Sequence, residues 1–150
     1  MTKSQTNHHL LHNLPLLTNE TTKQQKHDAI EKEIIKYDAI VNEINVHVDD
    51  CTRRADIAFE EMEKMNASSE EFKEASRKFG FNYYIAGYLA TIVQYAGKNG
   101  ASLKTLENRL RFHAHAQRSK GELNDGTELS AWRRGAADIM EGIINKFFES

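Results

Sequence analysis

Apolar residues recur in the first half of the chain at steps that alternate between four and three positions. The series begins at Ile30 and reaches Met65 without a slip. A mean spacing of about 3.5 residues keeps such side chains along one narrow edge of a helix. The pattern predicts one long amphipathic helix over about residues 22–65, and Thr22 and Gln25 have the spacing of a capping box at its start.

An apolar helix edge must be covered, and two coverings remain open. An antiparallel bundle within the chain uses this spacing. β-branched residues at every second edge position, namely Ile34, Val41 and Val48, favour pairing with a second copy of the chain. We expect self-association as a homodimer through this edge. The expected self-association seam consists of Ile30, Ile34, Tyr37, Val41, Ile44 and Val48.

Three shorter segments with helical spacing follow the long one, and they cover about residues 69–96, 102–120 and 127–148. The first of them is apolar on every side from Phe79 onward, which indicates that neighbours surround it. A single proline and eight glycines leave few interruptions, as expected for helices rather than for strands joined by turns. The sequence therefore predicts an all-α fold, a helical bundle in which a long N-terminal helix packs with three shorter helices.

Polar residues mark where the shorter helices begin. Ser68 and Glu71 form a second capping box, which predicts a helix start directly after Ser68. Ser102 and Thr127 are the expected N-cap residues of the last two helices. Gly121 is expected to end the third helix, because glycine is the usual residue at that position.

The sequence also predicts the domain organisation and the compartment. We expect one helical domain over residues 19–150, preceded by a flexible, histidine-containing leader over residues 1–18. Cys51 is the single cysteine, so no disulfide forms within the chain and the cytoplasm is expected. The uncharged stretch Phe79–Gly97 contains asparagine, threonine and glutamine, which is typical of a buried core helix rather than of a membrane span. No membrane partner is expected.

Positive charge is concentrated in the middle of the chain. Residues 76–121 hold eight basic residues and one acidic residue, Glu107. Within this segment the string GASLKTLENRL at Gly100–Leu110 resembles the turn and recognition helix of helix-turn-helix regulators of the arabinose-regulator type. The resemblance implies that residues 91–100 form the supporting helix, that the glycine makes the turn, that the serine caps the recognition helix and that the leucines anchor it.

One face of the implied recognition helix carries side chains suited to phosphates and base edges. This candidate macromolecule-binding face consists of Lys104, Asn108, Arg111, His115 and Arg118. A capped structural helix with leucines at helical spacing produces the same string without any nucleic acid. Both interpretations of the segment remain open.

The nearest candidate for metal-dependent chemistry is the string EEFKE at Glu70–Glu74, which resembles the motif of all-α nucleotide pyrophosphohydrolases of the MazG type. A Mg²⁺ cluster in such a protein takes carboxylates from two facing helices. No acidic residue lies between Glu74 and Glu107, and Asp138 and Glu141 would serve only if the last helix packed beside the second. We therefore expect no catalytic residue, no metal site and no cofactor.

Together these features predict a cytoplasmic, non-enzymatic helical regulator or inhibitor that acts by binding another macromolecule. A protein partner is expected, together with self-association through the long helix. The alternative is a dimeric DNA-binding regulator of helix-turn-helix type, with nucleic acid as its partner, that reads through residues 102–118. A third alternative is a small-ligand binder that uses the tyrosine-rich helix over residues 69–96.

Overall fold

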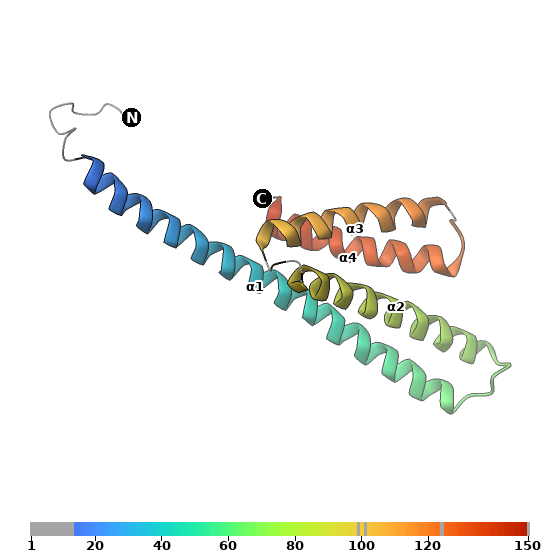
Figure 1. The fold of residues 1–150 in the computed structure, drawn as a ribbon. Coiled ribbons are helices and arrows are strands. Elements are labelled where there is room, and N and C mark those ends of the chain that lie inside the picture. Colours follow the sequence, from blue (N-terminus) through green and yellow to red (C-terminus); the bar gives the residue numbers. More distant parts are fainter. Residues whose placement is uncertain (1–13, 99, 101, 124, 150) are drawn as a thin grey trace. The chain divides into compact units, whose positions relative to one another are not determined.

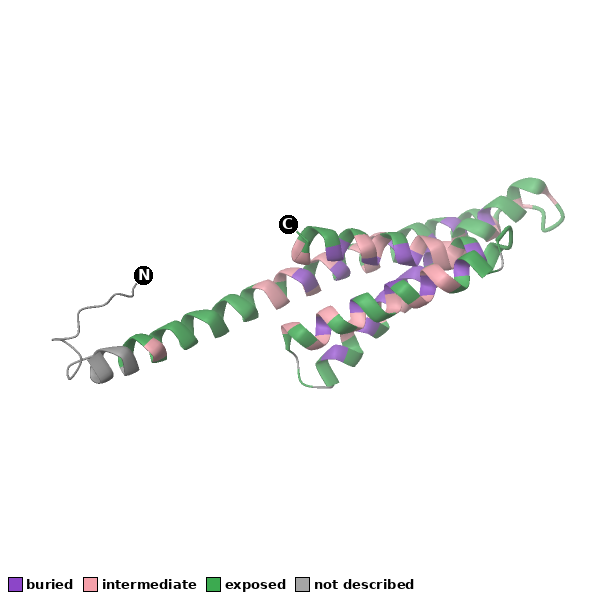
Figure 2. Ribbon diagram, turned by 90° about the horizontal axis from the view of Figure 1, so that it is seen from above, coloured by how far each residue is buried: buried purple, intermediate pink, exposed green. Residues whose placement is uncertain are grey.

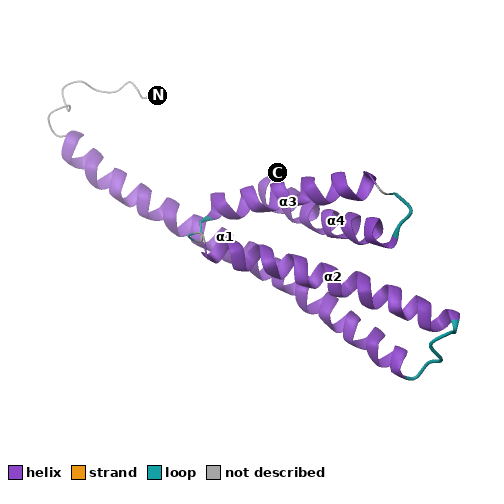
Figure 3. Ribbon diagram, turned by 45° about the vertical axis from the view of Figure 1, so that its right-hand side comes forward, coloured by secondary structure: helices purple, strands orange, loops and turns teal. Residues whose placement is uncertain are grey.

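Four α-helices make up the part of the chain that the computed structural model describes (Figure 1). That part comprises residues 14–98, 100, 102–123 and 125–149, with side chains from residue 20 onward. The helices are α1 (Leu14–Glu63), α2 (Glu70–Lys98), α3 (Leu103–Leu123) and α4 (Glu128–Phe148). No strand occurs among the described residues (Figure 3). The predicted all-α bundle with a long N-terminal helix and three shorter helices is confirmed.

The long helix begins earlier than the sequence indicated. α1 is already helical at Leu14, so residues 14–18 of the expected leader belong to it. Because the helix continues through Thr22, the backbone N–H groups of that turn bond within the helix and need no cap. The capping box expected at Thr22 and Gln25 is therefore wrong. The remaining leader residues, 1–13, lie outside the described residues.

The chain divides into two compact units, Met1–Ile35 and Lys36–Ser150. The first unit contains the N-terminal part of α1, in which every described side chain except that of Thr22 is exposed. The second unit contains the rest of α1 together with α2, α3 and α4. The single domain expected over residues 19–150 stays a prediction.

The core of the second unit takes side chains from all four helices. Ile40 and Ile44 of α1, Leu89 of α2, Leu110 of α3 and Met140 of α4 have no exposed surface. Burying one such side chain stabilises the fold by roughly 1.5–3 kcal/mol. Buried residues alternate with exposed ones along the helices (Figure 2), and the most extensive helix contact is that between α3 and α4.

The second helix is not surrounded on all sides, contrary to expectation. Its side chains at Ile85, Leu89 and Ile92 are buried, whereas Tyr83 is 68% exposed and Tyr95 is 48% exposed. A tyrosine ring is apolar but its hydroxyl group bonds to water, so tyrosine tolerates the surface. The tyrosines therefore made the helix look more apolar in sequence than it is in the fold.

Three glycines allow the helices to approach one another closely. A Cβ atom at Gly80 of α2 would lie 2.6 Å from Cζ2 of Trp132, and one at Gly135 of α4 would lie 2.7 Å from the ring of Phe81. Gly121 lies within α3 and does not end it, and a Cβ there would lie 2.8 Å from the side chain of an arginine of α4. The expected role of Gly121 is therefore wrong, because its missing side chain serves packing against α4.

Two of the predicted helix starts are confirmed by their capping hydrogen bonds. The backbone N–H of Thr105 donates to Oγ of Ser102 at 3.0 Å. The backbone N–H of Ser130 donates to Oγ1 of Thr127 at 3.0 Å. Each bond satisfies a backbone donor that the first turn of a helix leaves without a partner.

The predicted start of α2 is displaced by one residue. Oγ of Ser69 accepts a hydrogen bond from the backbone N–H of Phe72 at 3.1 Å, so Ser69 is the cap. The hydroxyl of Ser68 donates instead to Oδ1 of Asn66 at 2.8 Å, within the preceding turn. The capping box of Ser68 and Glu71 is therefore wrong, because Asn66 engages the Ser68 side chain.

Cys51 is free and lies in the core. Burial and the neighbouring carboxylate of Asp50 raise the pKa of its thiol above the ordinary value. On the apolar edge of α1, Cys51 therefore packs into the core as a small apolar side chain.

Candidate interaction surfaces

The structure divides the expected self-association seam into two parts. Ile44 is fully buried in the core of the second unit. Three more seam residues pack against that core, namely Tyr37, Val41 and Val48. Ile30 and Ile34 are 58% and 55% exposed. The seam from Tyr37 onward therefore contributes to the core of its own chain, whereas Ile30 and Ile34 remain accessible to water.

Polar groups surround the two exposed isoleucines. Nε2 of His27 lies 3.5 Å from a carboxylate oxygen of Glu31, and Gln24 donates a hydrogen bond to Asp28 at 3.0 Å. Oxygen and nitrogen atoms of His27, Asp28 and Glu31 lie within 4.8 Å of one another. All three side chains are exposed on one helix, as is ordinary for a solvated surface, so we assign them no metal. Ile35 is 67% exposed beside this group.

The candidate face of α3 ends at Arg118, and two carboxylates of α4 hold this residue. Nη2 of Arg118 donates to Oε1 of Glu141 at 2.7 Å, and Nε donates to Oε2 of the same carboxylate at 3.1 Å. Nη2 also donates to Asp138. These hydrogen bonds, first that to Glu141, raise the pKa of Arg118 far above its ordinary value. The forked geometry ties α3 to α4.

Arg111 and Lys104 of the same face are paired as well. Nε of Arg111 donates to Oε2 of Glu107 at 2.9 Å, and its Nη2 donates to Glu149 at 3.3 Å. Nζ of Lys104 lies 3.6 Å from Oε1 of Glu107. The hydrogen bond from Arg111 is the main cause that lowers the pKa of the Glu107 carboxyl, so this group is charged at neutral pH.

The lysine and the two arginines of the candidate face therefore each have an acidic neighbour. Asn108 and His115 complete the face and are exposed. The pairing of the α4 acids with this face was missed, because the sequence does not state which helix α3 faces. The sequence signal for this pairing was the three-residue spacing of Asp138 and Glu141, which puts both carboxylates on one side of α4. Because α3 and α4 are consecutive helices of an antiparallel hairpin, that side lies beside α3.

The acidic string at the start of α2 consists of ordinary ion-pair residues. Oε1 of Glu70 lies 3.3 Å from Nζ of Lys73, and Oε2 of Glu74 lies 2.9 Å from Nη2 of Arg77. The α4 acids that the sequence offered as a second set of ligands are those that hold the arginine of α3. Negative charge in the first turn of a helix is favoured by the helix dipole, and this accounts for Glu70 and Glu71.

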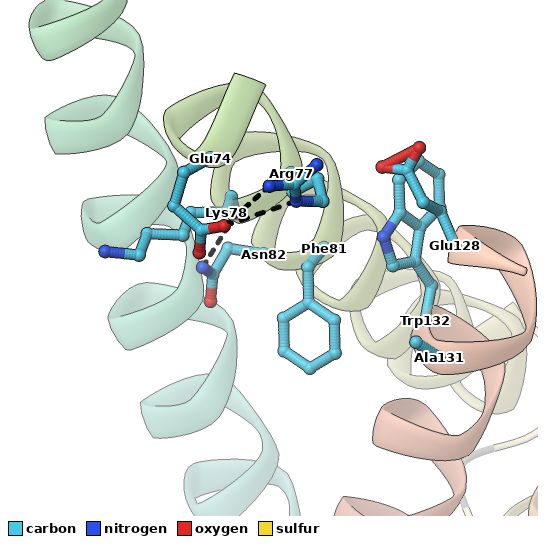
Figure 4. Close-up of a pocket in the computed structure, with 8 residues that line it drawn as sticks. All are labelled: Glu74, Arg77, Lys78, Phe81, Asn82, Glu128, Ala131 and Trp132. Carbon is cyan, nitrogen blue, oxygen red and sulfur yellow. Dashed lines mark hydrogen bonds and ion pairs between the residues drawn. The ribbon is translucent and has the colours of Figure 1, made fainter. Parts of the chain in front are cut away.

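A cleft of about 250 Å³ lies between α2 and α4 (Figure 4). Phe81 and Trp132 contribute its aromatic wall. Nη2 of Arg77 donates to Oε2 of Glu74 at 2.9 Å, and the amide of Asn82 donates to a backbone carbonyl one turn earlier at 2.9 Å. Because Arg77 and Asn82 already have hydrogen-bond partners within α2, we assign the cleft no ligand.

Comparisons of this chain with models of protein families, with curated proteins and with solved structures find no match. Within the described residues, no helix has the length and apolar character that crossing a membrane requires. Functional inference therefore depends on the surfaces described above.

Proposed function

We propose that the protein is a non-enzymatic helical interaction protein that binds other proteins and pairs with a second copy of itself through the N-terminal part of α1. The exposure of Ile30 and Ile34 carries this proposal. Two isoleucines one turn apart form an apolar stripe, and covering it with another helix removes that stripe from water. The cytoplasm is the proposed compartment, supported by the single cysteine, Cys51, which is buried and free.

The charges beside the two isoleucines suit a second copy of this chain. In a heptad that places Ile30 at position d and Ile34 at position a, Lys26 takes position g and Glu31 takes position e. In a parallel pair, position g of one helix faces position e of the next heptad of the other. Lys26 then faces Glu31 of the second copy, and the two-fold symmetry repeats this ion pair.

The same register limits the length and strength of the pair. Glu33 and Asp38 occupy the next facing positions and carry like charges, and from Tyr37 onward the seam packs on the core of its own chain. Burying two half-exposed isoleucines per copy contributes roughly 3–7 kcal/mol in total. Association itself costs about 4–15 kcal/mol. We therefore expect a weak dimer whose population rises with protein concentration.

The helix-turn-helix alternative receives less support from the same structure. Phosphates would have to displace Glu141 from Arg118, and Glu107 and Glu149 from Arg111, before they gained those contacts. Binding would start from a charge-balanced face rather than from a cationic one. Fluorescence anisotropy with duplex DNA at low and at moderate salt tests this alternative. Saturable binding that weakens steeply as salt rises would favour it over the protein-interaction proposal.

Analytical ultracentrifugation of the full chain tests self-association, from low micromolar to near-millimolar concentration. We expect the wild type to gain mass with concentration and a double variant, Ile30→Asp with Ile34→Asp, to remain a monomer. Ile35→Asp is the matched control, because Ile35 is more exposed than either seam residue but lies at position b, off the seam. A wild type that stays monomeric throughout, or a control that loses association as fully as the double variant, would overturn the proposal.

A further inference from the structure

A second cavity, of about 270 Å³, lies between α2 and α3 and is lined by residues of both helices. Its lining consists of Tyr88, Thr91, Ile92, Tyr95, Arg109 and His113. Sites for drug-sized ligands usually measure about 300–1,000 Å³, so this cavity fits a smaller molecule. All of its residues belong to the second unit and none belongs to the seam of α1.

Arg109 gives the cavity a positive charge that its surroundings do not balance. Its guanidinium carbon lies 4.0 Å from the ring centroid of Tyr95, so the cation stacks on an aromatic face. Arg111 and Arg118, the other arginines of α3, each hold two carboxylates, but no carboxylate of the described residues pairs with Arg109. Arg109 is half-buried. A cation that loses water without gaining an opposite charge is destabilised, and an anion in the cavity removes that cost.

Hydrogen-bonded side chains hold the imidazole ring of His113 in the same wall. The hydroxyl of Tyr84 donates to Oε1 of the buried Gln117 at 2.9 Å, which leaves the amide N–H groups of Gln117 to donate to Tyr88. The hydroxyl oxygen of Tyr88 lies 2.7 Å from Nδ1 of His113. This bond engages Nδ1 of His113, so Nε2 is the ring nitrogen outside it.

His113 therefore contributes a neutral imidazole ring rather than a second positive charge. Burial, and after it the charge of Arg109, lower the pKa of His113 below its ordinary value, so the ring is neutral at pH 7. The cavity then holds one cation, one neutral imidazole and the apolar surfaces of Ile92 and two tyrosine rings. The hydroxyl of Thr91 donates to the carbonyl of Gly87 at 2.7 Å, so towards a ligand it acts as an acceptor.

We propose that this cavity binds a small organic carboxylate with a flat apolar body. One guanidinium matches one negative charge, and the planar carboxylate matches the fork of Arg109 N–H groups. The tyrosine rings accept a flat ring by stacking or edge contact. The proposal is independent of pairing through α1, because the two sites share no residue.

Benzoate is a suitable probe, with benzamide as its neutral isostere and acetate as the anion without a ring. Titration of isotope-labelled full-length protein, followed by amide chemical shifts, should show saturable binding of benzoate with shifts confined to α2 and α3 around the cavity. We expect benzamide to bind at least about ten-fold more weakly, since a hydrogen bond to a charged group is worth roughly a factor of ten or more. Acetate keeps the charge but should also bind more weakly than benzoate, because it lacks the ring that contacts the tyrosines.

Two variants of α3 separate a built site from general attraction to a basic protein. Arg109→Gln should weaken benzoate binding about ten- to a hundred-fold. Arg111→Gln removes the same charge two residues away, outside the cavity, and should leave binding unchanged. Circular dichroism of both variants checks that the fold is retained. Equal binding of benzoate and benzamide, equal loss in the two variants, or no saturable binding to the wild type would each overturn the proposal.

Discussion

Two glycines of α4 offer a direct test of how closely this helix approaches α2. A Cβ atom at Gly142 would meet nothing within 4 Å, whereas one at Gly135 would lie 2.7 Å from the Phe81 ring and 3.2 Å from Cδ1 of Ile85. Both glycines lie within the same helix, so replacing either by alanine brings the same gain in helix propensity. The two variants differ only in what the added methyl group meets.

The expected magnitudes follow from this difference. Gly142→Ala should stabilise the protein by about 0.5–1 kcal/mol, because alanine loses less conformational entropy in a helix than glycine does. Gly135→Ala gains the same amount, but it forces the Phe81 ring to move, and overpacking of this kind costs about 1–3 kcal/mol. The two variants should therefore differ by about 1–3 kcal/mol. For a chain of this length each kcal/mol shifts Tm by about 2–4 °C.

Urea and thermal denaturation followed by far-ultraviolet circular dichroism would measure both variants beside the wild type. Gly87→Ala and Gly80→Ala repeat the comparison on α2, since Gly87 faces open space and Gly80 faces the Trp132 ring. If Gly135→Ala proves as stable as Gly142→Ala, the close approach of α2 and α4 is refuted. If neither open-site variant gains stability, the propensity argument fails instead.

Three further variants test separate parts of the structure by the same denaturation assay. Ser69→Ala should lose about 1 kcal/mol of stability because it removes the N-cap of α2, while Ser68→Ala should lose much less. If Ser68→Ala loses more stability than Ser69→Ala, then Ser68 is the N-cap residue. Burial lowers the pKa of His113 in the folded state, so the unfolded chain binds the proton more tightly and stability is lost as pH falls below about 6.5. His113→Gln should therefore lose less stability than the wild type between about pH 7 and pH 5.5. Equal losses in the two proteins would contradict this. Arg118→Met should cost about 1 kcal/mol in low salt and less in high salt, and a loss that salt does not change would argue against the ion pairs with α4.

The helices themselves were predictable because their signals are local. The 3.6-residue periodicity depends only on neighbours in sequence, and the caps at Ser102 and Thr127 bond to backbone groups three residues away. The errors at Thr22 and Ser68 are also local. At Thr22 the helix continues, so the backbone N–H groups already bond within α1. At Ser68 the hydroxyl group bonds to the side chain of Asn66 instead of capping α2.

The candidate sites were less predictable because their residues depend on the neighbouring helix. Gly121 resembles a helix end in sequence, and only the proximity of α4 gives it a packing role. Arg118 resembles a phosphate contact until Asp138 and Glu141 lie beside it. The unbalanced charge of Arg109 is likewise visible only in three dimensions, because it depends on no carboxylate of the described residues lying close enough to form an ion pair. Spacing along one helix describes a face but not what lies opposite.

Cys51 has a practical consequence for following the protein in solution. A thiol reacts with labelling reagents through its thiolate, and the core around Cys51 disfavours that form while keeping reagents out. Labelling is therefore restricted to molecules in which transient unfolding exposes Cys51, and the labelling rate depends on how often this unfolding occurs. The labelling rate of Cys51 therefore measures how often the core opens, and any ligand that binds only the folded protein should lower that rate.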